Sequence, residues 1–172
     1  MALLFGRRTE SALPVPIEEV NGGDGGIVQA QPDDLPAMDR IEHEAFSTPW
    51  SLDLIRGALV NPRYRVRVMR GADGKLIAFY IAHTTDNQSN LDNLAVTASS
   101  RRMGCGRRLV VDWIAHARRQ RLAALTLQVN TRNLAAERLY RAFGFRRVRM
   151  LPGYYPNGED AYQMEREMLS GP

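Results

Sequence analysis

Residues 91 to 117 contain a strand, a glycine-containing turn and a helix in direct succession, and this unit constrains the fold most strongly. Leu91 to Val96 forms a short strand-like stretch, and Gly104 and Gly106 lie in the turn that follows. From Gly106 to Ala117 apolar residues recur at helical spacing. A further strand is predicted at 125–129, and a helix that connects two neighbouring strands of one sheet leaves them parallel. The unit therefore predicts a sheet with some parallel pairing.

The rest of the chain shows the same strand and helix patterns. Alternating stretches bounded by turns predict strands, and apolar residues at helical spacing after Asp33 or Asp34 and after Ser51 predict helices. The order β-α-α-β-β-β-α-β-α-β-β predicts an α/β (α+β) fold, with a mixed central β-sheet flanked by helices. The predicted strands are 27–30, 64–70, 76–84, 91–96, 125–129, 145–151 and 161–165, and the predicted helices are 33–46, 51–59, 106–117 and 133–143.

The first 25 residues differ in character from the rest. They contain Pro14 and Pro16, show no sustained period and lead into the glycine-rich run 21–26. Such composition is typical of a flexible linker. We expect residues 1–25 to form a flexible N-terminal arm and residues 26–169 to form one domain.

Composition argues against several classes of protein. The net charge of +4 comes almost wholly from arginine, because Lys75 is the only lysine. The single cysteine, Cys105, cannot form an internal disulfide, which favours a reducing compartment and a cytoplasmic protein. The histidines at 43, 83 and 116 lack the spacing of a zinc site, so we expect no metal. We also expect neither membrane nor nucleic-acid binding, because the chain has no long apolar run and no basic stripe interleaved with aromatic residues.

The turn before the helix at 106–117 has the features of an anion-binding site. A helix N-terminus presents free backbone N–H groups and the positive end of the helix dipole. Gly104 and Gly106 allow the backbone to approach an anion closely. A dinucleotide fingerprint would need glycine in place of Leu109, and a P-loop would need Gly-Lys-Ser/Thr, so both are excluded. Positive charge around the turn comes from Arg101, Arg102, Arg107 and Arg108.

Several motifs resemble those of the GNAT superfamily of N-acetyltransferases. Arg101-x-x-Gly104-x-Gly106 is similar to the element that binds the pyrophosphate of coenzyme A in that superfamily. The set is similar to the RimI group, which acetylates the N-terminal amine of ribosomal and other proteins. The resemblance covers residues 27–168 and implies the GNAT fold. Its other matching segments are Asn93-Leu94-Ala95-Val96, residues 133–145, residues 154–164 and the helix-loop at 45–51.

The resemblance implies an enzyme that uses acetyl-coenzyme A, and it suggests which residues contact this cofactor. The strand backbone at Leu94, Ala95 and Val96 would pair with the pantetheine arm. Asn133, which can also cap a helix, would contact the cofactor as well. Tyr140 would return a proton to the departing thiolate, with a buried core tyrosine as the alternative. The pyrophosphate would be held by Arg101, Arg102, Met103, Gly104, Cys105, Gly106 and Arg107.

The strand at 125–129 departs from the RimI pattern. That group carries a glutamate, proposed as general base, where this chain has Gln128, which cannot take up a proton at neutral pH. Asp92 is expected to share strand parity with Leu94 and Val96. We hypothesise that Asp92 removes the amine proton through a water molecule that Gln128 orients, and a solvated surface acid is the alternative. An enzyme with weak base catalysis suits an N-terminal amine, whose pKa is about 7.7–8.0, better than a lysine side chain, whose pKa is about 10.4.

By resemblance, the acceptor cleft lies between the helix-loop at 45–51 and the hairpin at 153–158. Aromatic residues on both sides could grip an extended peptide end, and the acid Glu159 would suit a cationic amine. The expected function is acetylation of the N-terminal amine of a protein, such as a ribosomal protein, by a monomer or weak dimer. A small-molecule amine acetyltransferase and a non-catalytic coenzyme A-binding regulator stay open as alternatives. The expected acceptor contacts are Phe46, Pro49, Trp50, Tyr154, Tyr155 and Glu159.

Overall fold

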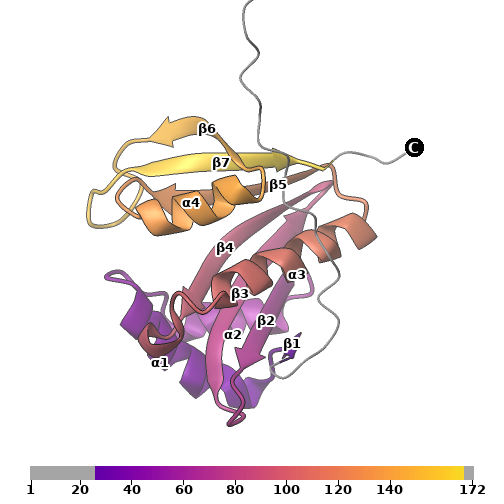
Figure 1. Ribbon diagram of the computed structural model, residues 1–172, viewed down its shortest axis with the longest axis vertical. Coiled ribbons are helices and arrows are strands. Elements are labelled where there is room, and N and C mark those ends of the chain that lie inside the picture. Colours follow the sequence, from indigo (N-terminus) through magenta and orange to yellow (C-terminus); the bar gives the residue numbers. More distant parts are fainter. Residues whose placement is uncertain (1–25, 169–172) are drawn as a thin grey trace, which may run out of the picture.

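Seven strands form one sheet in the order β1-β2-β3-β4-β5-β7-β6 (Figure 1). The computed structural model describes residues 26–168, so the predicted arm at 1–25 and Leu169 lie outside the described residues. The predicted order of strands and helices and the GNAT-type mixed sheet are confirmed. The strands are β1 (Ile27–Gln29), β2 (Tyr64–Arg70), β3 (Leu76–Thr85), β4 (Gln88–Val96), β5 (Ala124–Asn130), β6 (Arg146–Leu151) and β7 (Ala161–Glu167). The α-helices are α1 (Leu35–Ala45), α2 (Leu52–Val60), α3 (Cys105–Arg119) and α4 (Leu134–Ala142), with short 3-10 turns at Pro32–Asp34 and Ala98–Ser100.

Strand β4 begins three residues earlier than its apolar pattern predicts. Residues 88–90 are polar, yet they pair with β3 and with β5. Ser89 is buried, and its hydroxyl oxygen accepts a 2.9 Å hydrogen bond from the indole N–H of Trp113 in α3. Because a buried polar group needs such a partner, the packing of α3 allows polar residues to continue the strand.

The β4–β5 pair is the parallel pair that the sequence predicts, and it is short. It runs from Gln88 opposite Ala124 to Leu91 opposite Leu127. Beyond that point β4 continues to Val96 and β5 continues to Asn130. Figure 1 shows the two strands side by side at one end and spread apart at the other. The backbone edge of β4 after Leu91 therefore faces the gap between the two halves of the sheet.

A β-bulge at Asp92 changes the direction of the side chains in β4. Ala82 of β3 lies opposite Leu91 and Ile81 lies opposite Asn93, so that Asp92 has no partner of its own. An extra residue of this kind reverses the alternation of side chains beyond it. Leu94 consequently packs toward α3, whereas Asp92 lies on the other face. The expected shared parity of Asp92 with Leu94 and Val96 is therefore wrong, because alternation holds only for a regular strand.

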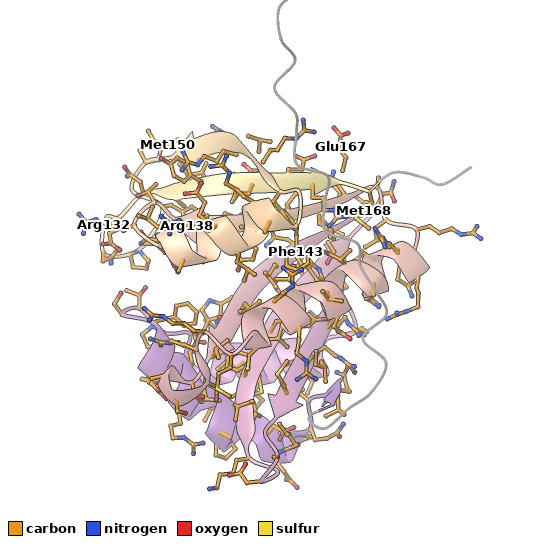
Figure 2. The ribbon with its side chains drawn as sticks, in the orientation of Figure 1. Arg132, Arg138, Phe143, Met150, Glu167 and Met168 are labelled. Atoms are coloured by element: carbon orange, nitrogen blue, oxygen red, sulfur yellow. The ribbon has the colours of Figure 1, made fainter. Side chains whose placement is uncertain are left out.

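Hydrophobic clusters cover both faces of the sheet. Helices α3 and α4 cover one face, where Trp113 stacks on Phe145 with ring centroids 5.6 Å apart and Phe143 lies between the two helices (Figure 2). Helices α1 and α2 cover the other face, where Met38 and Phe79 are fully buried. Each large apolar side chain buried in this way contributes about 1.5–3 kcal/mol. No helix within the described residues is long and apolar enough to cross a membrane.

Candidate active site

A cavity of about 590 Å³ lies where β4 and β5 diverge. Its walls come mainly from the loop between α1 and α2, from β4 and β5, from α4 with its N-cap Asn133, and from the loop between β6 and β7. Sites for small ligands in proteins have volumes of about 300–1,000 Å³. The cavity brings together residues from five separate parts of the chain, and its wall does not include the predicted pyrophosphate turn at 101–107.

The turn before α3 has a geometry that suits an anion, and its predicted contact with the cofactor stays a prediction. Gly104 is the N-cap of α3 with a φ of 83°, and no side chain caps the helix, so its first N–H groups stay available. A positive φ is strained for residues other than glycine, which explains Gly104. Arg101, Arg102 and Arg107 form no salt bridge with any carboxylate of the described residues. Uncompensated positive charge at a helix N-terminus suits a phosphate group.

The remaining residues of this turn have different environments. Met103 is 72% exposed, whereas Cys105 is a buried free thiol. A Cβ atom added to Gly106 would lie 3.3 Å from Leu139 of α4 and 3.8 Å from Leu94 of β4. A side chain at position 106 would therefore require Leu139 to shift by a few tenths of an ångström, so Gly106 also allows α3 to pack closely against α4.

Asn133 and Tyr140 lie on α4 and both line the cavity. The side chain of Asn133 caps α4 by accepting a 3.1 Å hydrogen bond from the N–H of Ala136. Tyr140 is 7% exposed and packs edge-on against Phe145. Burial raises the pKa of the Tyr140 hydroxyl, and nearby Tyr155 raises it further. The phenol therefore keeps its proton at neutral pH and can donate it.

A hydrogen-bonded polar network lies on the face of the sheet opposite α3. Asp92 Oδ2 is 2.6 Å from His83 Nδ1, and Asp92 Oδ1 accepts a 2.8 Å hydrogen bond from the amide of Asn90. The side-chain carbonyl oxygen of Asn90, Oδ1, accepts hydrogen bonds from the hydroxyl of Thr126 at 2.9 Å and from the amide of Gln128 at 3.4 Å. Asp92 and Gln128 line the cavity. The two residues that the sequence predicts to cooperate are thus connected through Asn90, which sequence reasoning missed.

The expected acceptor residues line the cavity from two loops. They are Phe46, Pro49 and Trp50 from the α1–α2 loop, and Tyr154, Tyr155 and Glu159 from the β6–β7 loop. The rings of Tyr154 and Tyr155 meet edge to face, with centroids 5.1 Å apart. The pKa of Tyr155 is raised to about 12. Burial of its hydroxyl is the main cause, and the nearby Tyr154 and Glu159 add to it. Both hydroxyls thus stay protonated and can donate hydrogen bonds to an acceptor backbone.

Glu159 is already engaged by its own neighbours. Its carboxylate accepts hydrogen bonds from Asn130 at 2.6 Å, Arg132 at 2.9 Å and Asn157 at 3.0 Å. Hydrogen bonds from Asn157 and Asn130, together with the charge of Arg132, lower the pKa of Glu159. The residue therefore ties the β6–β7 loop to the end of β5, and its contact with an acceptor amine stays a prediction.

Glu42 of α1 is a buried carboxylate in the cavity wall, and the sequence analysis did not identify it. It is 1% exposed. Its Oε1 accepts a 2.9 Å hydrogen bond from the backbone N–H of Trp50, and both its oxygens accept from the amide of Asn93 at 2.8–2.9 Å. Burial raises the pKa of Glu42, and this effect outweighs the hydrogen bonds from Trp50 and Asn93, which lower it. Its position four residues after buried Met38 and next to buried Ile41 is the sequence signal that could have found it.

A family model described as "Acetyltransferase (GNAT) family" matches residues 33–145. The chain belongs to the GNAT acetyltransferase family. The [ribosomal protein bS18]-alanine N-acetyltransferase of Escherichia coli K12 is 33% identical over 123 residues, which cover 72% of this chain and 82% of that relative. These matches confirm the resemblance to the RimI group.

Solved structures of the GNAT family have the same fold. The ribosomal-protein-S18-alanine N-acetyltransferase from Escherichia coli superimposes with a TM-score of 0.79 and 32% identity, covering 86% of this chain and 96% of that one. Ard1 from Thermoplasma volcanium gives a TM-score of 0.78 and 26% identity over 86% of this chain and 100% of that one. The described residues therefore contain nearly the whole fold of both relatives.

As a GNAT acetyltransferase, the protein uses acetyl-coenzyme A, as its sequence predicts. The described residues fit this cofactor, because the uncapped N-terminus of α3 suits the pyrophosphate and the edge of β4 after Leu91 is free to pair with an extended pantetheine arm. Leu94 lines the cavity, whereas the side chain of Ala95 is buried toward α1 and α2, which leaves its backbone for such pairing.

We expect replacement of Gly104 with alanine to weaken acetyl-coenzyme A binding about 10-fold. A Cβ at a φ of 83° costs about 1–2 kcal/mol, which the turn can relieve by moving its N–H groups. Calorimetric titration with acetyl-coenzyme A measures the change. The matched control is Gly57→Ala in α2, where an added Cβ meets no atom within 4 Å. Wild-type affinity in Gly104→Ala would show that this turn does not hold the cofactor.

Proposed function

We propose that the protein transfers the acetyl group of acetyl-coenzyme A to the N-terminal α-amine of a protein. The observation that carries this proposal is the position of the aromatic acceptor walls, Trp50 on one side and Tyr154 with Tyr155 on the other, around the gap between β4 and β5. An extended chain end fits between such walls. The Escherichia coli relative that acetylates the alanine of a ribosomal protein supports an acceptor of the same kind, a ribosomal protein.

The roles of the residues follow from their positions. When bound, acetyl-coenzyme A supplies an acetyl thioester, whose carbonyl the backbone N–H groups of β4 would polarise. Tyr140, protonated and facing the cavity, would donate its proton to the leaving sulfur. Asp92 would accept the proton of the amine through water, and Gln128 would orient that water. The Asn90 bridge between Asp92 and Gln128 supports this cooperation.

The absence of a carboxylate at position 128 favours an α-amine over a lysine. An α-amine with a pKa of about 7.7–8.0 is partly neutral at pH 7.5, whereas a lysine with a pKa of about 10.4 is neutral in only about 0.1% of molecules. A site that lacks a carboxylate base at this position therefore works best with an acceptor amine that is already partly neutral.

We expect turnover with a peptide that has a free N-terminal alanine and none with a blocked peptide of the same sequence that contains an internal lysine. Release of coenzyme A is followed at about pH 7.5 and about pH 9, on either side of the pKa of the α-amine. Turnover of the lysine peptide alone would contradict the proposal. Binding of acetyl-coenzyme A without turnover of either peptide would favour a small-molecule acceptor or a regulator without catalysis.

A further inference from the structure

His83 and Asp92 form a pair at the edge of the acceptor side of the cavity. Their hydrogen bond is short, at 2.6 Å between Nδ1 and Oδ2, and their side chains are 29% and 14% exposed. Asp92 lines the cavity, while His83 lies behind it on β3. Asp92 thus stands between the cavity and an imidazole that reaches solvent.

The pair is connected to the point where the family's usual base would lie. Asn90 donates to Asp92 and accepts from Gln128, so that its amide joins the pair to β5. The hydroxyl of Thr126 holds the same carbonyl oxygen of Asn90 at 2.9 Å and fixes the orientation of this amide. A chain of side chains from β5 to β3 therefore begins at Gln128, which cannot accept a proton, passes through Asp92, whose carboxylate can, and ends at His83.

We propose that the His83–Asp92 pair accepts the proton of the acceptor amine, with Asp92 as the group that takes up the proton and His83 as the positioning residue whose Nδ1–H holds the Asp92 carboxylate. This inference rests on the proposed function, because it assigns the proton path of that reaction. It adds His83 and Asn90 to the site, neither of which the sequence motifs identify.

The step balances without any further reactant. The amine nitrogen forms a bond to the acetyl carbon, the bond from that carbon to sulfur breaks, and Tyr140 supplies the proton that the sulfur takes. The proton of the amine passes through water to Asp92, which becomes a carboxylic acid while His83 keeps the proton on Nδ1. The net charge of the pair thereby changes from −1 to 0. Asp92 then releases the proton to solvent, from which Tyr140 is protonated again.

The surroundings of the pair suit a proton acceptor. The ring of Tyr64 from β2 lies 5.5 Å from that of His83. Tyr154 of the β6–β7 loop faces Asp92. Burial raises the pKa of Tyr154, and the charge of Asp92 raises it further. The ionisable groups that face the pair from β2, β4 and this loop are thus Tyr64, Asp92 itself and Tyr154. Lysine and arginine form no salt bridge with Asp92 among the described residues, so the imidazole of His83 and the amide of Asn90 are its side-chain partners.

We expect His83→Gln to lower kcat for the free-alanine peptide about 100-fold at pH 7, the lower end of the contribution of a general base. The loss should shrink toward pH 9, where more of the amine is already neutral. KM values for peptide and acetyl-coenzyme A should change less than about twofold, because His83 lies outside the cavity wall. Asp92→Asn should show the same loss and the same change in its pH–rate profile.

Two further variants separate a proton-transfer role from a structural one. His83→Ala should regain activity when imidazole is added, because the free base can replace the missing ring, and a merely structural defect would not respond. His43→Gln is the matched control, since His43 is exposed on α1 and lies outside the network. Wild-type kcat and pH profile in His83→Gln, or a loss that imidazole does not restore, would overturn the inference.

The wild-type protein is measured first, which separates the two proposals. Turnover of the alanine peptide by the wild type, together with an unaffected His83→Gln, contradicts the proton path alone. Failure of the wild type to acetylate any free-amine peptide contradicts both. If His83→Gln shows a lower melting temperature, the pH profile of Asp92→Asn and the imidazole response of His83→Ala decide the question.

Discussion

Tyr140→Phe should lower kcat about 10²- to 10⁴-fold, the range that a general acid contributes. The variant removes only the hydroxyl, so the edge-on contact with Phe145 and the position of α4 are kept. Binding of acetyl-coenzyme A should therefore stay within about twofold of the wild type. Steady-state kinetics with the free-alanine peptide, combined with calorimetric titration of the cofactor, measure both quantities.

The control for Tyr140→Phe removes the hydroxyl of another tyrosine, one that does not line the cavity. This residue is Tyr162 of β7, which is not part of the cavity wall. The Cζ atom of Arg147 lies 3.9 Å from the centroid of the Tyr162 ring. Tyr162→Phe should keep wild-type kcat. Equal activity of Tyr140→Phe and the wild type would show that the thiolate leaves without help from this residue.

Glu42→Ala should destabilise the fold by about 3 kcal/mol and lower the melting temperature by about 6–12 °C. The substitution leaves the backbone N–H of Trp50 and the amide of Asn93 without their acceptor in a buried site. Loss of these bonds also frees the α1–α2 loop, so KM for the peptide should rise. Urea unfolding and peptide kinetics test the two consequences.

Glu42→Gln is the informative partner of that variant. Its amide can accept from Trp50 and donate to Asn93 Oδ1, which is buried without a partner in the described structure, once the Asn93 amide rotates. We therefore expect its stability at pH 7 to lie within about 1 kcal/mol of the wild type. A loss as large as that of Glu42→Ala would show that the charge itself is required.

The raised pKa of Glu42 also predicts a pH dependence. The folded state holds this proton more tightly than the unfolded state, so the stabilisation is complete below the ordinary value of 4.5 and is lost as the pH rises through the folded-state pKa. Wild-type stability should thus fall relative to Glu42→Gln as the pH rises above 4.5. A difference that does not change with pH would contradict the assignment.

Local patterns predicted most of the elements. The strand at 64–70 has the predicted bounds, and Ser51 caps α2 by accepting from the N–H of Leu54 at 3.3 Å. Asn133 caps α4 as expected. These features depend on residues within three or four positions of each other, whose hydrogen bonds follow from the backbone geometry of a single element.

The network around Asp92 could not be predicted in the same way. The sequence identified Asp92 and Gln128 but placed Asp92 on the wrong face of β4, because the bulge depends on how β3 and β4 pair. His83 was interpreted as structural, since nothing near it in the chain shows that Asp92, nine residues away, lies 2.6 Å from its ring. Pairing register decides such contacts, and a shift of one residue changes which side chains meet.

The sequence by itself determined the family, the order of elements and the positions of the glycine turn before α3 and of Tyr140 on α4, because these depend on short motifs and on periodicity. Tertiary structure alone decided that Glu42 joins Asn93, 51 residues away, and that β4 and β5 separate after Leu91. Both depend on the packing of helices and strands that are distant in the chain. Local hydrogen bonds select the elements, whereas the burial of polar groups and the pairing of strands select the site.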